Sequence, residues 1–367
     1  MKPIKIGIVG AGGVAQWGHI PSLQGIPGVE VAALSDPNKE KLESVSKEFN
    51  IADTYTEYEK LIEREDLDGV SVCTPTCLHA EVSMAALQSG KNVLCEKPFA
   101  INAQQAEAVV RTALKSGKLF LLNLSQRFDL TTEIIDSYIR KGTLGYIYYA
   151  KCSYLRRKGH PGLGGWFTHK KDSGGGSLMD IGIHVMDLGM FFLGSPKPVS
   201  VTASAYDCLT KNAHDGGWPP SSTRLGDDFN KKVDTEDLAT ALIRFESGST
   251  LLLEAGWTGY SETGMKISLF GAKAGVELVK AAGGVDEGRP IRFSILEETD
   301  GHLVEINPVV PALYSYWDQT FPGFIRHFVA CIRNEETPVV EPDYLLTVQR
   351  IIDSIYLSAA NGKEVRL

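Results

Sequence analysis

Short apolar runs alternate with helical patterns along residues 4–122, and this alternation constrains the fold more than any other feature of the chain. The apolar runs are rich in β-branched residues, and the segments between them carry apolar residues at helical spacing. Because continuous apolar strands separated by helices pair in parallel and are covered on both faces, we predict a doubly wound α/β sheet. The predicted strands are 4–9, 29–34, 69–73, 92–95 and 119–122, and the predicted helices are 14–23, 39–49, 58–62, 80–88 and 103–115.

The pattern changes after residue 123, where strand-like stretches are grouped together. This grouping indicates a C-terminal α+β domain with a large, mostly antiparallel open sheet. We therefore expect two domains, 1–123 and 124–367, and the C-terminal helix could pack back on the first domain. A polar, Gly- and Pro-containing segment, 207–234, is expected to be a long loop. The predicted strands are 146–154, 199–206, 238–245, 250–256 and 266–270, and the predicted helices are 131–141, 178–192, 324–333 and 344–361.

Composition excludes several classes of protein. The net charge of −8 argues against a nucleic-acid partner, which requires a basic face. No apolar run approaches the ~18 residues of a membrane span, and the N-terminus begins as a strand rather than a signal peptide. We therefore expect a cytoplasmic protein without a membrane partner. The six cysteines lack zinc-ligand spacing, so reduced thiols and no metal are predicted.

A glycine turn follows the first predicted strand. Gly10 suits a tight turn, Gly12 leaves room for a pyrophosphate, and Ala15 is small enough for helix–strand contact. Asp36 ends the second strand, where a carboxylate can bind an adenosine ribose and would repel a 2′-phosphate, so NAD is favoured over NADP. A purely structural turn is the alternative. The cofactor-binding residues predicted here are Gly10, Gly12, Gly13, Val14, Ala15 and Asp36.

Two further stretches carry chemical groups. Lys97 follows the strand 92–95 and should emerge at the carboxyl edge of the sheet, and Pro98 makes a cis Lys97–Pro98 bond plausible. Asp180 and His184 share one face of the helix 178–192 with Asp187. Together these groups suit oxidation of a secondary alcohol: His184 as base, Lys97 polarising the oxygen, and Asp180 orienting the imidazole or binding a substrate hydroxyl. The alternatives are a surface lysine and a hydrogen-bonded core histidine.

These motifs resemble the glucose–fructose oxidoreductase/inositol dehydrogenase/rhizopine catabolism (Gfo/Idh/MocA) family. The resemblance rests on the glycine turn, on Glu96-Lys97-Pro98, and on Gly174-Gly175-Gly176 followed by Asp180 and His184. It implies an N-terminal NAD-binding Rossmann domain and a C-terminal domain whose open sheet joins a homodimer or homotetramer. It also implies that Lys97, Asp180 and His184 are catalytic, that Arg127 lies near the substrate, and that the cofactor contacts Cys73, Thr74, Pro75, Glu96 and Lys97.

The segment 156–170 resembles the subgroup that acts on pyranoses, anhydrosugars and inositols, although it could be a basic surface loop. We expect an NAD-dependent dehydrogenase that takes a hydride from a CH–OH group of such a sugar or cyclitol. An NAD-dependent glycoside hydrolase that oxidises its substrate transiently is an alternative, and a non-catalytic NAD-binding regulator is disfavoured by the intact catalytic set. The candidate substrate residues are Arg127, Arg156, His160, Trp166, His169 and Lys170.

Other polar residues are expected to be structural. His19 in the first helix and His79 after a strand are predicted to cap or pack within the first domain. The acidic residues between Asp234 and Asp237 are predicted to be the polar start of a strand. No function is assigned to them from the sequence.

Overall fold

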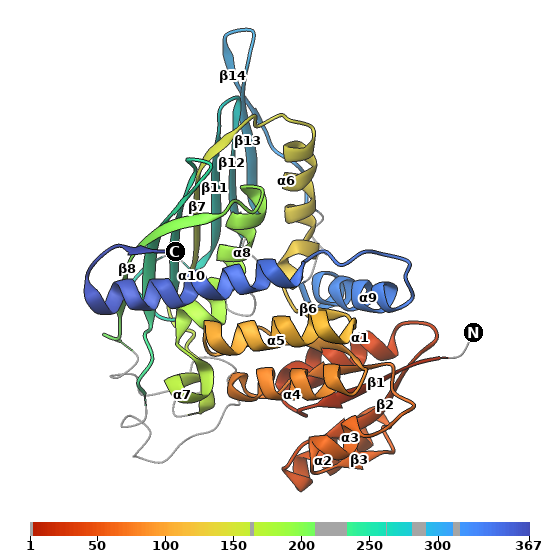
Figure 1. Cartoon of the computed structure of the whole chain (residues 1–367). Coiled ribbons are helices and arrows are strands. Elements are labelled where there is room, and N and C mark those ends of the chain that lie inside the picture. Colours follow the sequence, from red (N-terminus) through yellow and green to blue (C-terminus); the bar gives the residue numbers. More distant parts are fainter. Residues whose placement is uncertain (1–2, 162–164, 210–232, 262, 281–290, 311–315) are drawn as a thin grey trace. The chain divides into compact units, whose positions relative to one another are not determined.

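The computed structural model describes residues 3–161, 165–209, 233–261, 263–280, 291–310 and 316–367 (Figure 1). They divide into two units: unit 1 comprises 1–128 and 315–346, and unit 2 comprises 129–314 and 347–367. Most of the expected 207–234 loop lies outside the described residues. Among the described residues, no helix combines the length and the apolar character needed to cross a membrane.

Unit 1 contains a six-stranded sheet in the order β3-β2-β1-β4-β5-β6, and every neighbouring pair is parallel. This order is that of the Rossmann fold, so the predicted doubly wound sheet is confirmed. The strands are β1 (Ile4–Val9), β2 (Val29–Ser35), β3 (Thr54–Tyr55), β4 (Gly69–Val72), β5 (Asn92–Cys95) and β6 (Phe120–Leu122). The helices are α1 (Ile20–Gln24), α2 (Lys39–Phe49), α3 (Tyr58–Ile62), α4 (Thr76–Gln88), α5 (Ala103–Ser116) and α9 (Phe321–Ile332).

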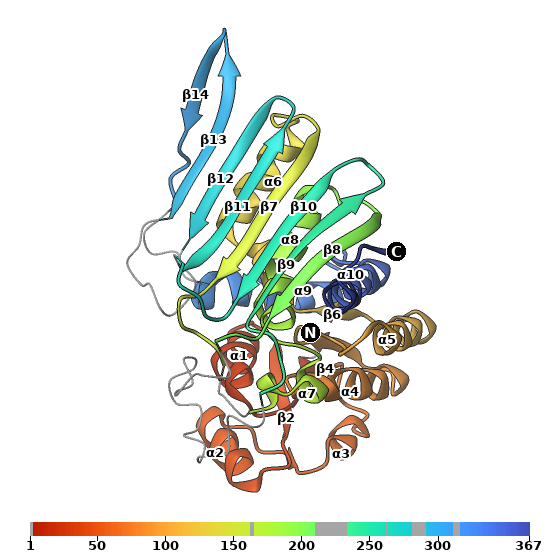
Figure 2. The same ribbon diagram turned by 90° about the vertical axis from the view of Figure 1, so that its left-hand side faces the viewer.

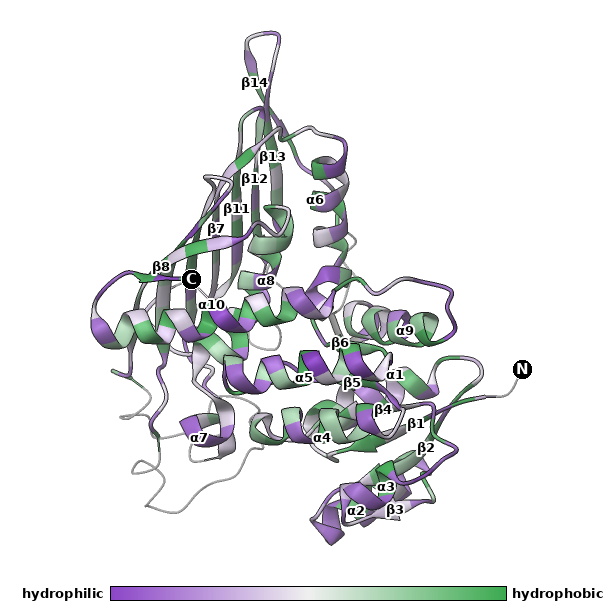
Figure 3. Ribbon diagram, in the orientation of Figure 1, coloured by the Kyte–Doolittle hydropathy of each residue, from purple (hydrophilic) through white to green (hydrophobic). Residues whose placement is uncertain are grey.

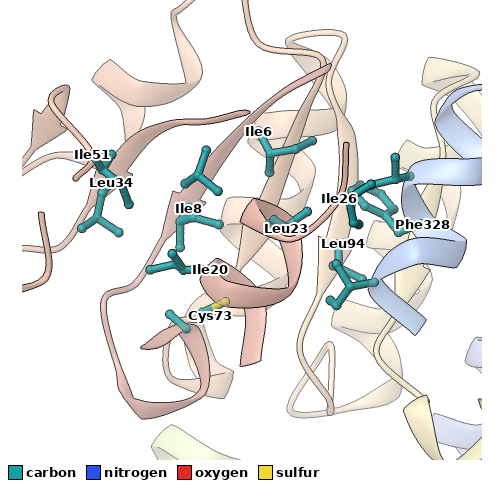
Figure 4. Close-up of a cluster of buried hydrophobic side chains, with 14 of the residues drawn as sticks. Ile6, Ile8, Ile20, Leu23, Ile26, Leu34, Ile51, Cys73, Leu94 and Phe328 are labelled. Atoms are coloured by element: carbon teal, nitrogen blue, oxygen red, sulfur yellow. The ribbon is translucent and has the colours of Figure 1, made fainter. Parts of the chain in front are cut away.

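The core of unit 1 forms between its sheet and helices from both ends of the chain. Ile6 and Ile8 of β1 are fully buried, and Phe324 and Phe328 of α9 belong to the same apolar cluster (Figure 4). The strands are largely hydrophobic, whereas α2 is mostly hydrophilic (Figure 3). Strands buried on both faces and helices with one wet side are the expected pattern for a parallel sheet.

The predicted helix 14–23 is present, but it is not α-helical throughout. A π-helical turn over Ala15–His19 precedes α1, so the segment is not one continuous α-helix. Pro21 is the physical reason, because a proline has no N–H to donate to the fourth residue before it. Gly18 lies within this turn, and a Cβ there would come 2.5 Å from the ring of Phe321. The turn therefore also admits an aromatic ring of α9.

Unit 2 contains a nine-stranded sheet in the order β14-β13-β12-β11-β7-β10-β9-β8-β15 (Figure 2). The pairing is antiparallel except between β7 and β10, which confirms a large, mostly antiparallel sheet. Its strands are β7 (Ile147–Leu155), β8 (Pro198–Tyr206), β9 (Leu238–Phe245), β10 (Thr250–Gly256), β11 (Gly264–Gly271), β12 (Ala274–Lys280), β13 (Arg292–Thr299), β14 (His302–Ile306) and β15 (Val365–Arg366).

The helices of unit 2 include α6 (Leu130–Arg140), α7 (Lys170–Ser173) and α8 (Ile183–Phe192), and α8 packs on β7, β10 and β11. The helix α10 (Pro342–Asn361) begins in unit 1 and ends in unit 2. In its last part, Ser358 accepts a hydrogen bond from the amide of Ala203 at 2.9 Å. This contact ties the end of α10 to strand β8.

The predicted helix 178–192 is also present, but its first turn, Leu178–Gly182, is π-helical and α8 follows it. Asp180 therefore lies in a widened turn, and Asp187, which is 1% exposed, does not extend a polar stripe at α-helical spacing. Gly182 passes close to β10, since a Cβ there would lie 2.9 Å from that of Ala255. A glycine with a low helix propensity permits this irregular turn.

Candidate functional site

The glycine turn of unit 1 has the geometry that the sequence predicted. Gly10 has a φ of +98°, and a Cβ at that position would lie 2.6 Å from the carbonyl oxygen of Cys73. The nearest neighbour to a Cβ on Gly12 is 4.0 Å away, so space remains beside this residue. Gly13 and Val14 are half-buried at the start of the helical turn, and Ala15 is fully buried. The backbone conformation at position 10 and its contact with Cys73 therefore require a glycine, whereas Gly12 leaves room for a ligand.

Asp36 lies directly after β2 and is 6% exposed. Its carboxylate accepts hydrogen bonds from the amides of Ala11 and Asn38, both at 2.9 Å, and from the Lys41 ammonium at 3.3 Å. The bond to Ala11 holds the acid against the glycine turn. A carboxylate at this place can accept hydrogen bonds from ribose hydroxyls.

Cys73, Thr74 and Pro75 follow strand β4. Cys73 is buried, and the backbone of Thr74 lies against Gly10. The Thr74 hydroxyl oxygen is buried and has no hydrogen-bond partner among the described residues. A buried polar atom without a partner is costly unless a ligand or water satisfies it. The open space at Gly12, the Thr74 hydroxyl and the Asp36 carboxylate together fit a dinucleotide.

Glu96 is held in a buried polar network that the sequence did not predict. Its carboxylate accepts hydrogen bonds from His19 at 2.8 Å and from the side-chain amide of Asn123. On the other side of the ring, the Ser71 hydroxyl lies 2.7 Å from Nδ1 of His19. His19 is thus more than a packing residue, because it ties the helical turn after the glycines to the ends of β4 and β5.

The contacts in this network shift the pKa of both His19 and Glu96. Burial acts to lower the pKa of His19, but Cys73 and Glu96 outweigh it and raise the pKa to about 10. Burial acts to raise the pKa of Glu96, but His19 and Asn123 lower it to about 2. The site therefore carries a charged pair, and the Glu96 member of it directly precedes Lys97 in the chain.

Lys97 lies in the loop after β5 and is half-buried. The Lys97–Pro98 peptide bond is cis, as the sequence suggested. The two ring nitrogens of His79 lie 2.6 Å from the Pro98 carbonyl oxygen and 2.7 Å from that of Thr74. His79 therefore links the loop that carries Lys97 to the loop that carries Thr74, a role that the sequence did not indicate.

Arg127 also belongs to unit 1. It is 9% exposed, donates a hydrogen bond to the carbonyl of Val339 at 3.2 Å, and lies 4.7 Å from the ring centre of Tyr344. These contacts join it to the chain segment that returns to unit 1. Its expected role near the substrate stays a prediction.

Asp180 has a defined position in unit 2. The indole N–H of Trp257 donates to its Oδ2 at 2.8 Å, and Trp257 itself is fully buried at the end of β10. Burial acts to lower the pKa of Arg156, but Tyr154 and the charge of Asp180 outweigh it and raise that pKa. Trp257 was missed from the sequence, although a tryptophan directly after a predicted strand was the available signal.

Arg156 and His160 are both buried, at 9% and 2% exposed. Arg156 donates to the Gly159 carbonyl at 2.9 Å and to the Tyr154 hydroxyl at 3.3 Å. His184 is half-buried in the first turn of α8. Within unit 2 the structure thus joins Asp180 to Trp257 by a hydrogen bond, whereas the guanidinium of Arg156 donates to Gly159 and Tyr154.

The rest of the expected substrate segment is aromatic and charged. The rings of Trp166 and Phe167 stack with centres 3.7 Å apart. His169 pairs with Asp172 at 3.3 Å, and the Lys170 ammonium lies 5.3 Å from the ring centre of Tyr356. Residues 162–164 of this segment lie outside the described residues.

The chain matches two family models over nearly its whole length. Residues 4–124 match the oxidoreductase family with an NAD-binding Rossmann fold, and residues 137–367 match the C-terminal alpha/beta domain of that family. D-glucoside 3-dehydrogenase of Escherichia coli K12 is 29% identical, and the alignment covers 100% of this chain and 98% of that protein. The scyllo-inositol 2-dehydrogenase (NAD(+)) of Bacillus subtilis 168 is 23% identical, with coverage of 92% and 88%.

Solved structures agree with this assignment. The aldose-aldose oxidoreductase from Caulobacter crescentus, complexed with glycerol, has a TM-score of 0.78, 25% identity and full coverage of both chains. Levoglucosan dehydrogenase in complex with NADH has a TM-score of 0.83 at 18% identity and 99% coverage of both chains, a likeness of fold. The protein therefore belongs to the Gfo/Idh/MocA oxidoreductase family and is an NAD-binding oxidoreductase with an N-terminal Rossmann fold.

Proposed function

We propose that this protein transfers a hydride from a secondary alcohol of a sugar, anhydrosugar or inositol to NAD. The observation that carries the proposal is that the glycine turn and the Lys97 loop follow strands of the same parallel sheet. Strand β1 precedes the turn, β5 precedes the loop, and β4 pairs with both strands. The carboxyl ends of such strands form the ligand-binding edge of an open α/β sheet.

The proposed chemistry assigns one task to each polar group. The Lys97 ammonium polarises the alcohol oxygen and stabilises its developing negative charge. The His184 imidazole takes the hydroxyl proton, because its ordinary pKa is near neutrality. Asp180, with one oxygen fixed by Trp257, orients this imidazole or binds a neighbouring substrate hydroxyl. Bound NAD supplies the hydride acceptor.

Three observations support a polyol as the substrate. Relatives along the full chain are named for glucosides and inositols. Asp180, which Trp257 holds, offers a charged acceptor, and Arg156 offers a charged donor, and both suit hydroxyl groups. The stacked pair of Trp166 and Phe167 offers an aromatic surface of the kind that CH-rich sugar faces contact. Arg127, His160, His169 and Lys170 are proposed as further substrate contacts.

The test is a screen for NADH formation with NAD and a panel of inositols, free aldoses, anhydrosugars and glycosides. A dehydrogenase accumulates NADH in proportion to substrate consumed. Release of the aglycone from a glycoside without net NADH would instead identify the NAD-dependent hydrolase. If neither product formed with any compound while NAD bound, the proposal would be wrong.

Two further properties are part of the proposal. NAD should bind more tightly than NADP, because Asp36 lies at the edge of the glycine turn. The open sheet of unit 2 is proposed to join a homodimer or homotetramer, which light scattering coupled to size-exclusion chromatography would determine.

A further inference from the structure

Glu236 is a buried carboxylate that lies shortly before strand β9 and is 9% exposed. Its Oε2 accepts a hydrogen bond from the amide of Gly176 at 2.8 Å. Its Oε1 accepts two more, from the amide of Leu178 and from the hydroxyl of Tyr356, both at 3.0 Å. All three partners are donors, so the carboxylate acts only as an acceptor here.

These contacts supply a missing helix cap. The amides at the start of a helix have no partner within it, and a neighbouring side chain normally satisfies them. Ser177, the residue at the cap position before the π-helical turn, makes no capping hydrogen bond with its side chain. Glu236, from a different part of unit 2, takes this role, and its negative charge suits the positive end of the helix dipole.

The glycines before the helix have a matching reason. A Cβ on Gly175 would lie 1.8 Å from the Tyr356 hydroxyl, and a Cβ on Gly176 would lie 1.9 Å from the backbone oxygen of Glu236. The amide of Ser177 donates to that same oxygen at 3.2 Å. Glycine is required here because the protein itself, rather than a ligand, occupies the space next to the backbone.

The residue after Glu236 reaches the same cluster by a second route. The carbonyl of Asp237 accepts a hydrogen bond from the amide of Trp257 at 2.9 Å, and the Trp257 indole holds Asp180 at 2.8 Å. Glu236 therefore fixes the start of the segment that carries Asp180. Its neighbour Asp237 fixes the backbone of Trp257, whose indole holds the Asp180 carboxylate.

We propose that Glu236 is a positioning residue that sets the place of Asp180 and His184 by anchoring the Gly174–Gly176 turn. This inference rests on the proposed function of those two residues. It predicts that weakening the anchor lowers the rate of the chemical step and leaves NAD binding, which the proposal assigns to the glycine turn of unit 1, unchanged.

The test compares Glu236→Gln with Tyr356→Phe. The glutamine amide presents an NH₂ group to a donor and cannot satisfy all three partners, whereas the phenylalanine removes one donor and keeps the carboxylate. We expect kcat for the best polyol to fall about tenfold or more in Glu236→Gln, with KM for NAD within about twofold, because the variant loses the negative charge that faces the amides of Gly176 and Leu178. Tyr356→Phe should stay within about threefold of the parent kcat.

Hydrogen exchange gives a readout that does not depend on activity. The amides of Gly176 and Leu178 should be protected in the parent and in Tyr356→Phe, and should exchange faster in Glu236→Gln. Unprotected amides in the parent would overturn the anchor even if no polyol were oxidised, so failure of this inference is distinct from failure of the proposed function.

A purely structural role for Glu236 makes a different prediction. In that case Glu236→Gln would lower the thermal midpoint but retain the parent kcat per NADH-binding site, and this result would overturn the proposal. Should Glu236→Gln fail to fold, Glu236→Asp keeps the charge on a shorter side chain and replaces it in the kinetic test. A lower kcat at unchanged KM for NAD is then expected, and an unchanged kcat would contradict the inference.

Discussion

The two glycine turns of this protein resemble each other in sequence and differ in purpose. Beside Gly12 in unit 1, the nearest atom to a Cβ is 4.0 Å away, so the turn is open. Beside Gly175 and Gly176 in unit 2, a Cβ would meet Tyr356 and Glu236 at 1.8 and 1.9 Å. The first turn thus has space for a ligand, and the second is filled by the protein. A run of glycines before a helix does not by itself indicate a phosphate site.

A buried glutamate accompanies each turn, and their environments also differ. Glu96 is paired with a histidine, which together with Asn123 lowers the pKa of the carboxyl despite its burial. Glu236 has neutral donors only; burial raises its pKa, and the hydrogen bonds from Leu178 and Gly176 oppose the rise. A buried carboxylate can therefore be stabilised by an opposite charge in one unit and by hydrogen bonds from backbone amides in the other.

The largest effect is expected from replacing Lys97, the group proposed to polarise the alcohol oxygen, while both glycine turns stay intact. Lys97→Met should lower kcat about 10²- to 10⁴-fold, the usual range for a positioned acid–base group. The thermal midpoint should change little, because the Lys97 side chain is only half-buried. Steady-state kinetics measure kcat and thermal unfolding measures the midpoint, with Lys118→Met, at an exposed lysine of unit 1, as the matched control. Unchanged turnover would rule out the proposed chemistry.

The filled turn should respond to a methyl group by losing stability. In Gly176→Ala the new Cβ meets the backbone oxygen of Glu236, which cannot move as a side-chain end could. We expect unfolding free energy to fall by about 3 kcal/mol, the upper part of the range for overpacked sites. Urea unfolding measures the loss. Gly259→Ala is the control, because a Cβ there meets nothing within 4 Å; equal stability of the two variants would contradict this reading.

The open turn should respond to the same methyl group by losing affinity. Gly12→Ala is expected to leave the urea midpoint unchanged and to weaken NAD binding about tenfold, which corresponds to 1.4 kcal/mol. Fluorescence or calorimetric titration with NAD provides the measurement. A destabilised variant that binds NAD normally would show that the two turns do not differ as described.

The smallest effect concerns pH. The pKa of His19 is raised in the folded state, so its stabilising contribution is complete below pH 6.5 and is lost as pH rises from there to about 10. The pKa of Glu96 is lowered, so its contribution is complete above pH 4.5 and is lost as pH falls towards about 2. The urea midpoint of the parent should therefore decline across the alkaline range, and that of His19→Asn should decline less. Parallel curves would exclude the ion pair as the cause.

The sequence predicted those parts of the molecule that rest on local pattern. The strand–helix alternation, Gly10, Gly12 and Asp36 follow fixed spacings, and the cis bond before Pro98 was anticipated from one residue. The roles of His19, Glu236 and Trp257 depend on partners 77, 60 and 77 positions away in the chain. A local sequence pattern does not indicate contacts between residues so far apart in the chain. A histidine in a helix and an acid before a strand were therefore expected to be ordinary structural residues.

Strands β12, β13 and β14 were missed for a related reason. In β12 the apolar residues are separated by Gly275 and Glu277, and glycine and glutamate are both disfavoured in strands. Most residues of the β14 strand are exposed, and Glu297 and Glu298 make β13 look like a polar loop. Charged residues on strands at the edge of a sheet discourage pairing with another chain, and they also weaken the pattern from which a strand is predicted.

The course of the chain through unit 1 has a consequence for its synthesis. Residues 1–128 contain all six strands of the first sheet, yet Phe321, Phe324 and Phe328 of its core come from helix α9. A ribosome makes the sheet first and the aromatic side chains that complete its core only near the end. The nascent first unit must therefore carry an exposed apolar surface while the whole of residues 129–314 is translated, a stretch during which chaperones would have a binding site that the finished protein lacks.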